Sequence, residues 1–369
     1  MIRNFKRTAA ILGVVAAGSA TLVACGDSDN GSTTETTAAA IEGLSGTTGQ
    51  LVAEGASSQQ NAMDYFGQKY QEAVSGATLA YTASGSGSGR TNFVGGQVAF
   101  AGSDSPLSED QVAPAAERCE GNDAWHLPFV IGPVAIAYNL EGVDELNLSI
   151  ENVAKIFKGE ITKWNDEAIS AENEGVELPD TDISVVYRSD ESGTTDNFQK
   201  FLGAAAGDVW ETEGQQFPAG VGEGANGSNG VASQVSAIDG GITYVESGFA
   251  TQQGLGVANL DFGAGPVELN TESVGVALDN LEFATEGNDM VVDTDTLFAS
   301  NAEGSYPLIL TTYEIVCSAG YDEETRDLVK DFFKIVLEAG QTEELQDLGY
   351  IPVQGSFKDK LTEAVDAIQ

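Results

Sequence analysis

The sequence predicts an α/β fold with a mostly parallel sheet. In the first hundred residues, three short apolar segments have the composition of strands, and each stops at a turn of small, hydroxyl-bearing residues. Apolar residues at helical spacing follow the first turn, and the same order returns later in the chain. Strands that alternate with turns and helices are typical of parallel α/β sheets.

Four apolar segments give the strands expected in the N-terminal part of the chain: residues 50–53, 79–81, 98–100 and 127–131. Between the first two, apolar residues recur every three or four positions from Met63 to Val74, which indicates a helix that Gly76 ends. A shorter helix is expected over Val153–Phe157, with Gly159 at its C-terminus.

Three further strands are expected at residues 183–187, 241–245 and 308–316. A helix follows the first of them, because Phe198, Phe201 and Leu202 share one helical face. Asp322 has the position of an N-cap for the next helix, which carries two glutamates in its first turn and ends at Gly340. Residues 214–230 are rich in Gly and Asn and are expected to form a loop, whereas the weak periodicity of 259–306 assigns no elements.

The charge balance excludes several classes of protein. The chain has 369 residues, of which 57 are acidic, 16 basic and one is histidine, for a net charge of −41. Such a surface repels nucleic acid, and it offers no basic patch for anionic lipid. A single histidine also argues against His-rich metal sites and Ser-His-Asp catalysis. The 41% of hydrophobic residues suffices for a core, which excludes a disordered acidic tail.

The first twenty-five residues have the pattern of an export signal. Arg3, Lys6 and Arg7 precede an apolar stretch, residues 9–23, which is short for a membrane span. The ending, Leu22-Val23-Ala24-Cys25-Gly26, resembles the lipobox of bacterial lipoproteins, in which the cysteine is lipidated. The alternative is a plain signal peptide with an incidental cysteine.

We therefore expect a signal peptide over 1–24, followed by lipidated Cys25 and a flexible tether that reaches residue 47. The tether is expected because this stretch consists mainly of Ser, Thr, Gly, Ala and acidic residues. Cleavage would change the net charge to −44, since the signal contains three basic residues and no acidic one. The mature protein would lie outside the cytoplasmic membrane, on its outer face.

Cys119 and Cys317 are the other two cysteines. In an oxidising compartment two remaining thiols favour a disulfide. Two buried free cysteines are the alternative.

Four turns carry the residues suited to binding: 57–58, 85–89, 103–104 and 188–195. In parallel α/β sheets ligands bind beyond the carboxyl ends of the strands. Small residues let an anion approach the free N–H groups of helix N-termini, and hydroxyls add neutral donors. The chain contains no Gly-Lys-Ser/Thr sequence, and the glycines of 85–89 lack the dinucleotide spacing. These turns therefore predict a site for a small oxyanion.

The combination of motifs resembles the substrate-binding lipoproteins of phosphate-specific ABC transporters, over nearly the whole mature chain. The segments that carry the resemblance are Gly55–Ser58, Ser86-Gly87, Ser103–Ser108, Lys155–Gly159, Ile161–Asp166, Arg188–Thr195 and Gly241–Glu246.

The resemblance implies the ligand contacts of that family at the matching positions: Ser57, Ser58, Ser86, Asp104, Arg188, Ser192, Gly193 and Thr194. Many members have Phe at the position of Ser58, so its backbone N–H is the expected contact. The resemblance also implies inorganic phosphate as ligand, permease and ATPase subunits as partners, no cofactor, no metal and no enzymatic activity. The membrane contact would be through the N-terminal lipid only.

Two charged residues fit this reading. Arg188 carries the only strong positive charge among the four turns and could bind two ligand oxygens bidentately. Asp104 can only accept, so it suits a ligand that brings a proton, such as HPO4(2−) or H2PO4(−), and opposes fully ionised sulfate. Arg90 would neutralise Asp104 or its loop, or it is a plain surface arginine.

The implied architecture is a type II periplasmic-binding-protein fold, with two α/β lobes around a ligand cleft. Lobe 1 would hold residues 48–138 and 307–369, and lobe 2 residues 139–306. Crossings at Tyr138-Asn139 and Tyr306-Pro307 would form the hinge. Both cysteines would then lie in lobe 1.

Three alternatives remain open, and the third is a surface protein used mainly for adhesion or signalling. The first is a receptor for another oxyanion, sulfate or molybdate. The second is a secreted phosphatase or hydrolase that uses one of the serines. Against the second, His126 lies far from the four turns in sequence and is expected to be structural, and no Asp/His/Glu cluster has metal-ligand spacing.

Overall fold

The computed structural model describes residues 41–218, 220–279, 281–299 and 302–369. The predicted signal peptide, Cys25 and the tether up to residue 40 lie outside the described residues. No helix among the described residues is long and apolar enough to cross a membrane.

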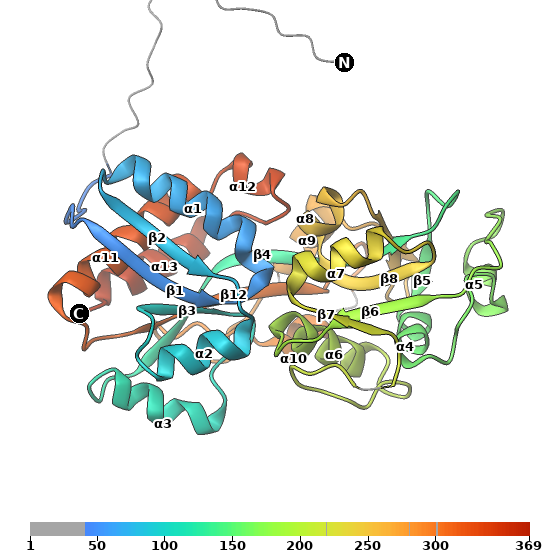
Figure 1. Ribbon diagram of the computed structural model, residues 1–369, viewed down its shortest axis with the longest axis horizontal. Helices are drawn as coiled ribbons and strands as arrows, with labels where there is room; N and C mark the ends of the chain where they lie inside the picture. Colours follow the sequence, from blue (N-terminus) through green and yellow to red (C-terminus); the bar gives the residue numbers. More distant parts are fainter. Residues whose placement is uncertain (1–40, 219, 280, 300–301) are drawn as a thin grey trace, which may run out of the picture. The chain divides into compact units, whose positions relative to one another are not determined.

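A nine-stranded sheet runs through the folded part of the chain (Figure 1). Its strands lie in the order β2 (Ala77–Thr82), β1 (Gly49–Gly55), β3 (Phe100–Ser103), β12 (Ile309–Cys317), β4 (Ala124–Asn139), β8 (Gly241–Glu246), β6 (Ser184–Arg188) and β7 (Glu223–Ala225), with β9 (Gly256–Val257) paired to β4. A second, three-stranded sheet contains β11 (Pro266–Val267), β10 (Asn259–Asp261) and β5 (Asn147–Ser149).

The prediction of a mostly parallel sheet is right at the two ends of the large sheet and wrong at its centre. β1 pairs in parallel with β2 and β3, and β6 pairs in parallel with β7 and β8. At the centre, β12 is antiparallel to β3 and β4, and β4 is antiparallel to β8. The reason is that β4 and β12 join the two parallel groups, and each runs against its neighbours.

β4 pairs directly with β8 of one parallel group and reaches the other group through β12. It pairs with β12 up to Pro133 and with β8 from Val134 to Asn139. The change of partner therefore falls within the strand, five residues before the predicted lobe boundary at 138/139, which stays a prediction.

Helices cover the strands on both sides of this junction (Figure 1). The parallel strands β1, β2 and β3, which we call the β1 group, lie with these helices: the 3-10 turn η1 (Ser57–Gln59), α1 (Gln60–Ala73), α2 (Ser86–Val94), α3 (Glu109–Arg118), α11 (Glu323–Ile335), the π turn η2 (Val336–Gly340), α12 (Glu343–Asp347) and α13 (Gly355–Ala367). The parallel strands β6, β7 and β8, the β6 group, lie with the other helices: α4 (Ile150–Lys158), α5 (Glu167–Glu172), α6 (Gly193–Ala205), α7 (Gly227–Ser236), α8 (Ser247–Gln252), α9 (Thr271–Leu278) and α10 (Thr294–Phe298).

Aromatic packing fixes α11 against the sheet. Phe333 stacks on Phe129 of β4 at 4.5 Å between ring centroids, and Phe332 stacks on Phe100 of β3 at 5.6 Å. All four rings are fully buried, and such pairs add about 1 kcal/mol each beyond their area burial. The apolar face predicted for this helix is therefore confirmed, as is Asp322 as its N-cap, which accepts from Thr325 N–H at 3.0 Å.

A disulfide joins Cys119, at the C-terminus of α3, to Cys317, at the end of β12. It connects positions 198 residues apart in sequence. Both elements belong to the part of the fold that contains the β1 group.

The loop predicted for residues 214–230 is wrong at its end, because β7 and the first turn of α7 lie within it. Val231 and Val235 bury one face of α7, and this burial stabilises a helix with a glycine-rich start. The segment 259–306, to which no elements were assigned, contains β10, β11, α9 and α10. All are short, which explains the weak periodicity.

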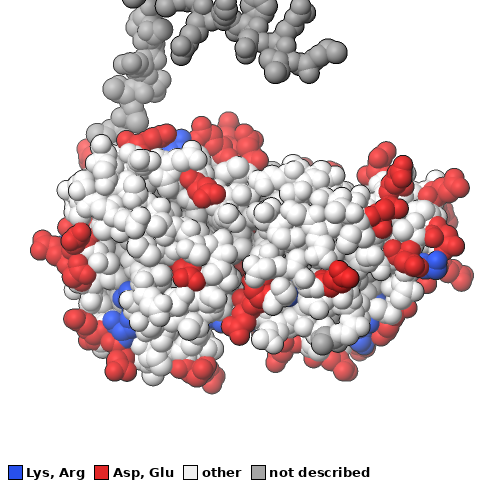
Figure 2. Space-filling view, viewed as in Figure 1, with Lys and Arg blue, Asp and Glu red and all other residues white. Residues whose placement is uncertain are grey.

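Acidic side chains lie around much of the outline of the face seen in Figure 2, with only a few basic ones between them. This distribution follows from the net charge of −41. A bound anion must therefore be stabilised by local contacts, because the long-range field opposes its approach.

Candidate functional site

Five strand ends of the large sheet bring helix N-termini to one place. η1 follows β1, α2 follows β2, α6 follows β6, α7 follows β7, and the Asp104 loop follows β3. η1, α2 and α7 begin without a hydrogen bond from the side chain of their N-cap residue, although the first two N–H groups of α7 donate to Asp190 and Ser57. Backbone donors and the positive ends of helix dipoles therefore lie close together, as an anion requires.

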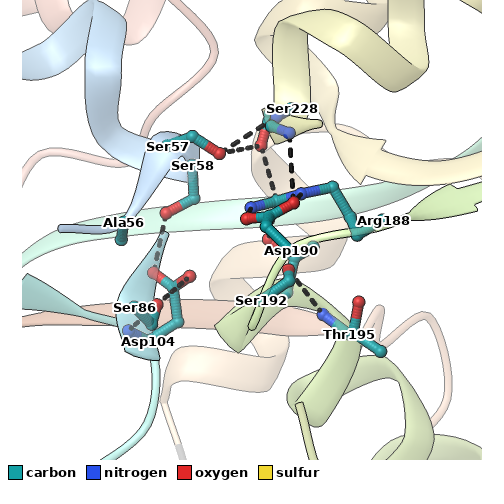
Figure 3. A network of polar contacts seen from close by, with 12 residues as sticks. Ala56, Ser57, Ser58, Ser86, Asp104, Arg188, Asp190, Ser192, Thr195 and Ser228 are labelled. Atoms are coloured by element: carbon teal, nitrogen blue, oxygen red, sulfur yellow. Dashed lines mark hydrogen bonds and ion pairs between the residues drawn. The ribbon is translucent and has the colours of Figure 1, made fainter. Parts of the chain in front are cut away.

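One side of the site consists of Ser57, Ser58, Ser86 and Asp104, and the other begins with Arg188 and Ser192 (Figure 3). Gly193 and Thr194 belong to this other side, since they open α6 and Thr194 Oγ1 accepts from Arg188. We call these the first and second sides. All eight were predicted from the sequence, all are buried, and the structure brings them together.

Asp104 is the centre of the first side. Ser58 Oγ and Thr312 Oγ1 each donate to Asp104 Oδ1 at 2.7 Å, and Ser86 Oγ donates to Oδ2 at 3.1 Å. The Ser58 hydroxyl is thus engaged with Asp104, which agrees with the expectation that its backbone N–H would be the ligand contact.

Burial and, after it, the nearby carboxylate of Glu246 raise the pKa of Asp104 to about 6. The hydrogen bonds from Ser58 and Thr312 oppose this shift. Near neutral pH the group is therefore mainly ionised, yet it takes up a proton far more readily than an exposed aspartate.

Arg188 dominates the second side, with 2% of its surface exposed. Its Nε donates to Asp190 Oδ1 at 2.8 Å, and Nη2 donates to Oδ2 of the same carboxylate. Nη1 is directed to the hydroxyls of Ser228, at 3.2 Å, and Thr194, at 3.3 Å. Asp190 therefore occupies the Nε/Nη2 edge of Arg188, and Nη1 faces the other hydroxyls, while bidentate binding of two ligand oxygens by Arg188 stays a prediction.

The ion pair shifts both pKa values away from neutrality. For Arg188, burial alone would lower the pKa, but the hydrogen bonds and charge of Asp190 outweigh burial and raise it. For Asp190, burial alone would raise the pKa, and Arg188 lowers it below the usual value. The pair stays charged across the physiological range.

Ser192 and Gly193 begin α6. Ser192 is its N-cap, and its Oγ accepts from Thr195 N–H at 3.1 Å. Gly193 is packed so closely against the first side that a Cβ there would overlap Asp104 Cβ and lie 2.5 Å from Ser86 Oγ. Glycine at this position is what lets the two sides meet.

Four polar residues at the site were not among the predicted contacts: Asp190, Ser228, Glu246 and Thr312. Ser228 connects the two sides, since its N–H donates to Ser57 Oγ at 3.0 Å and the two hydroxyls lie 3.2 Å apart. Glu246 accepts from Thr194 Oγ1 at 2.7 Å through Oε1, while its buried Oε2 has no partner among the described residues.

Some of these residues had a detectable signal. Val231 and Val235 have helical spacing after Ser228, which would have indicated a helix N-terminus there. Thr312 is a polar residue in an apolar strand. Asp190 and Glu246 stand in the motifs of the resemblance, but only the fold shows their contacts.

Arg90 is buried, so it is not a plain surface residue; it forms no direct ion pair with Asp104 among the described residues, but its charge interacts with Asp104 and its side chain bonds to the Asp104 loop. Its Nη1 donates to Ser103 Oγ and Ser105 O, both at 3.4 Å, and its Nη2 donates to Gln215 Oε1 at 2.8 Å. Ser105 in turn donates to Asp196 of α6 at 2.6 Å. Arg90 therefore holds the Asp104 loop and links it to the second side.

His126 lies on β4 outside this site. Its Nε2 accepts from Leu107 N–H at 2.9 Å, and its Nδ1 lies 2.7 Å from Asp289 Oδ1. These contacts fit the structural role expected for it. No group of three or more potential metal-ligating side chains occurs among the described residues.

The charge balance of the site restricts its ligand. One guanidinium faces three buried carboxylates, those of Asp104, Asp190 and Glu246. Asp190 is paired, so an incoming anion would meet two further negative groups. A ligand that carries its own proton can donate to such groups, whereas a fully ionised one cannot.

The comparisons with known proteins point to the same chemistry. The sequence matches the PBP superfamily domain over residues 29–338. It is 46% identical to the phosphate-binding protein PstS 3 of Mycobacterium tuberculosis, over 99% of this chain and 100% of that protein. The chain belongs to the PstS family of phosphate-binding proteins.

More distant PstS proteins show the spread of the family. The phosphate-binding protein PstS of Xylella fastidiosa is 34% identical, over 71% of this chain and 70% of its own. The resemblance found in the sequence is thereby confirmed.

Solved structures share the fold. A high-affinity periplasmic phosphate-binding protein, PfluDING, determined with phosphate, superposes with a TM-score of 0.67 at 23% identity, covering 85% of this chain and 93% of its own. A putative phosphate ABC transporter substrate-binding protein from Clostridium perfringens superposes with a TM-score of 0.60 at 16% identity. The match covers 83% of this chain and 100% of that protein. The predicted type II periplasmic-binding-protein fold is confirmed.

Proposed function

We propose that this PstS protein binds inorganic phosphate with high affinity outside the cytoplasmic membrane and delivers it to an ABC permease for import. The observation that carries the proposal is Asp104, a buried carboxylate among hydroxyl donors and helix N-termini. Phosphate meets both demands of such a site, because its ionised oxygens accept hydrogen bonds and its P–OH group donates one.

The eight predicted residues would each contribute to phosphate binding. Ser57, Ser86 and Thr194 supply hydroxyls, Ser58 and Gly193 supply backbone N–H groups, and Ser192 caps α6. Arg188 supplies charge through Nη1, held in place by Asp190. This is binding without bond cleavage, and no histidine lies among these residues to activate a serine.

The location follows from the N-terminal sequence. Signal cleavage before Cys25 and lipidation of that cysteine would anchor the protein to the outer face of the membrane. The predicted tether ends earlier than residue 47, because Ser45 and Gly46 donate to Asp331 of α11, and the segment before residue 41 would let the folded part reach a permease.

Asp104→Asn is expected to lower the ratio of phosphate to sulfate affinity about ten- to hundredfold. The aspartate accepts the phosphate proton and repels sulfate, whereas the asparagine amide donates to either anion. Titration calorimetry with both anions at constant pH and ionic strength measures the ratio.

The matched control is Asp322→Asn, the same chemical change at the exposed N-cap of α11, where asparagine also caps well. It should leave the ratio unchanged. If Asp104→Asn kept the wild-type ratio, Asp104 would not be the discriminating group, and a receptor for sulfate or molybdate would come back into consideration.

A further inference from the structure

Glu314 is a second buried acid behind the site, and none of the contacts described above use it. It lies on β12, opposite Gly102 of β3 and Leu127 of β4, at the centre of the sheet. It is fully buried, and neither carboxyl oxygen has a hydrogen-bond partner among the described residues. Burying an ionised carboxylate without hydrogen-bond partners costs folding free energy, so the environment of Glu314 favours its neutral, protonated form.

Within the described part of the chain, no positively charged group acts on Glu314. The titratable groups that interact with Glu314 are Tyr81 of β2 and Asp104 after β3, and Tyr350, which follows α12, interacts in turn with these two. β4 presents the apolar Leu127 directly opposite. Burial raises the pKa of Glu314 well above its usual value, and the charge of Asp104 adds to the shift, while the adjacent Gln59 side chain opposes it.

Gln59 supplies a complementary acceptor. It is fully buried, and its Oε1 has no partner among the described residues, whereas its Nε2 donates to Tyr81 Oη at 3.0 Å. A Cβ on Gly102 would overlap Gln59 Nε2, so glycine leaves the room that the amide occupies. The amide oxygen of Gln59 can accept a hydrogen bond from the carboxyl group of Glu314 only if Glu314 is protonated, because an ionised carboxylate has no proton to donate.

The chain of donors continues to the first side of the site. Tyr81 Oη donates to Ala56 O at 2.8 Å, and Tyr350 Oη donates to Ser58 O at 2.6 Å. The backbone that presents Ser57 and Ser58 is therefore held from behind by two tyrosine hydroxyls. The hydrogen bonds run from Gln59 Nε2 to Tyr81 Oη and from Tyr81 Oη to Ala56 O, and they leave Gln59 Oε1 free to accept a hydrogen bond from a protonated Glu314.

We propose that Glu314 is held as a neutral carboxylic acid and acts as a positioning residue, donating to Gln59 and so fixing the Ala56–Ser58 turn. The consequence for affinity rests on the proposed phosphate function, whereas the protonation of Glu314 does not.

The first test is an infrared difference spectrum between ligand-free wild type and Glu314→Gln at neutral pH. Glutamine is close in shape, and its NH2 group can donate to Gln59 Oε1, so the variant is expected to fold. Wild type should show the C=O stretch of a carboxylic acid, sensitive to D2O, that the variant lacks. A carboxylate band in its place would overturn the proposal.

Thermal unfolding against pH gives a second readout with a defined sign. The pKa of Glu314 in the folded protein lies above its unfolded value of about 4.5. The free energy of unfolding therefore holds its full contribution from Glu314 below about pH 4.5 and loses it as pH rises toward the folded-state pKa. The melting temperature of wild type should therefore fall relative to Glu314→Gln between pH 5 and about pH 8. A difference independent of pH would contradict a bound proton.

Affinity separates the positioning role from protonation alone. Glu314→Gln should bind phosphate within about threefold of wild type, while Glu314→Leu, which cannot donate, should bind about tenfold more weakly. Gln59→Leu should lose phosphate affinity to the same extent as Glu314→Leu, while its infrared spectrum should keep the C=O band of the protonated Glu314. Unchanged affinity in both leucine variants would overturn the positioning role, and failure of wild type to bind phosphate would refute the proposed function without altering the spectroscopic result.

Discussion

Arg188→Gln is expected to weaken phosphate binding at least about a hundredfold, because it removes the only positive charge among the eight predicted site residues. The same change leaves Asp190 as an unpaired, largely buried carboxylate. Breaking a buried ion pair from one side costs about 3–5 kcal/mol of folding free energy. Titration calorimetry and chemical denaturation would measure the two effects on the same preparation.

The double variant Arg188→Gln/Asp190→Asn separates the two effects. It removes the orphaned charge, so the unfolding free energy should recover most of its loss while phosphate affinity stays low. Arg188 would be structural rather than a ligand contact if the double variant bound phosphate nearly as tightly as wild type.

Gly193→Ala should weaken phosphate binding about ten- to hundredfold without unfolding the protein. The added methyl group would overlap Asp104 Cβ, a rigid point on the first side, and would therefore hold the two sides apart. Alanine itself suits the first turn of α6 better than glycine, by about 1 kcal/mol, so the helix should remain intact. Phosphate affinity and the melting temperature of the ligand-free protein would both be measured.

Gly203→Ala provides the control on the same helix. Its new methyl group would meet nothing within 4 Å, so phosphate affinity should not change. Equal affinities for the two variants would mean that the close approach of Gly193 to Asp104 is not needed for binding.

The sequence predicted most of the residues that the structure brings together at the site, because they stand in short motifs at strand ends. What it missed depends on contacts between distant segments. The Nε/Nη2 edge of Arg188 is used by Asp190, two residues away, yet the pairing depends on the turn that both residues share. Ser228 was hidden in a glycine-rich stretch assigned to a loop, and only the packing of α7 brings it to Ser57.

The centre of the fold was missed for a similar reason. Strand periodicity shows that residues 308–316 are extended but not the direction of their neighbours, so the antiparallel β12 was counted in a parallel sheet. Glu314 was likewise one acidic residue in an apolar strand, and its importance appears only with Gln59 and Tyr81 beside it.

Titration calorimetry of the mature protein with phosphate, sulfate and molybdate, at one pH and ionic strength, tests the central claim most directly. The account predicts tight binding of phosphate, sulfate binding weaker by orders of magnitude, and no release of phosphate from a chromogenic ester under the same conditions. Absence of heat and of thermal stabilisation with phosphate, or a preference for sulfate or molybdate, would contradict it.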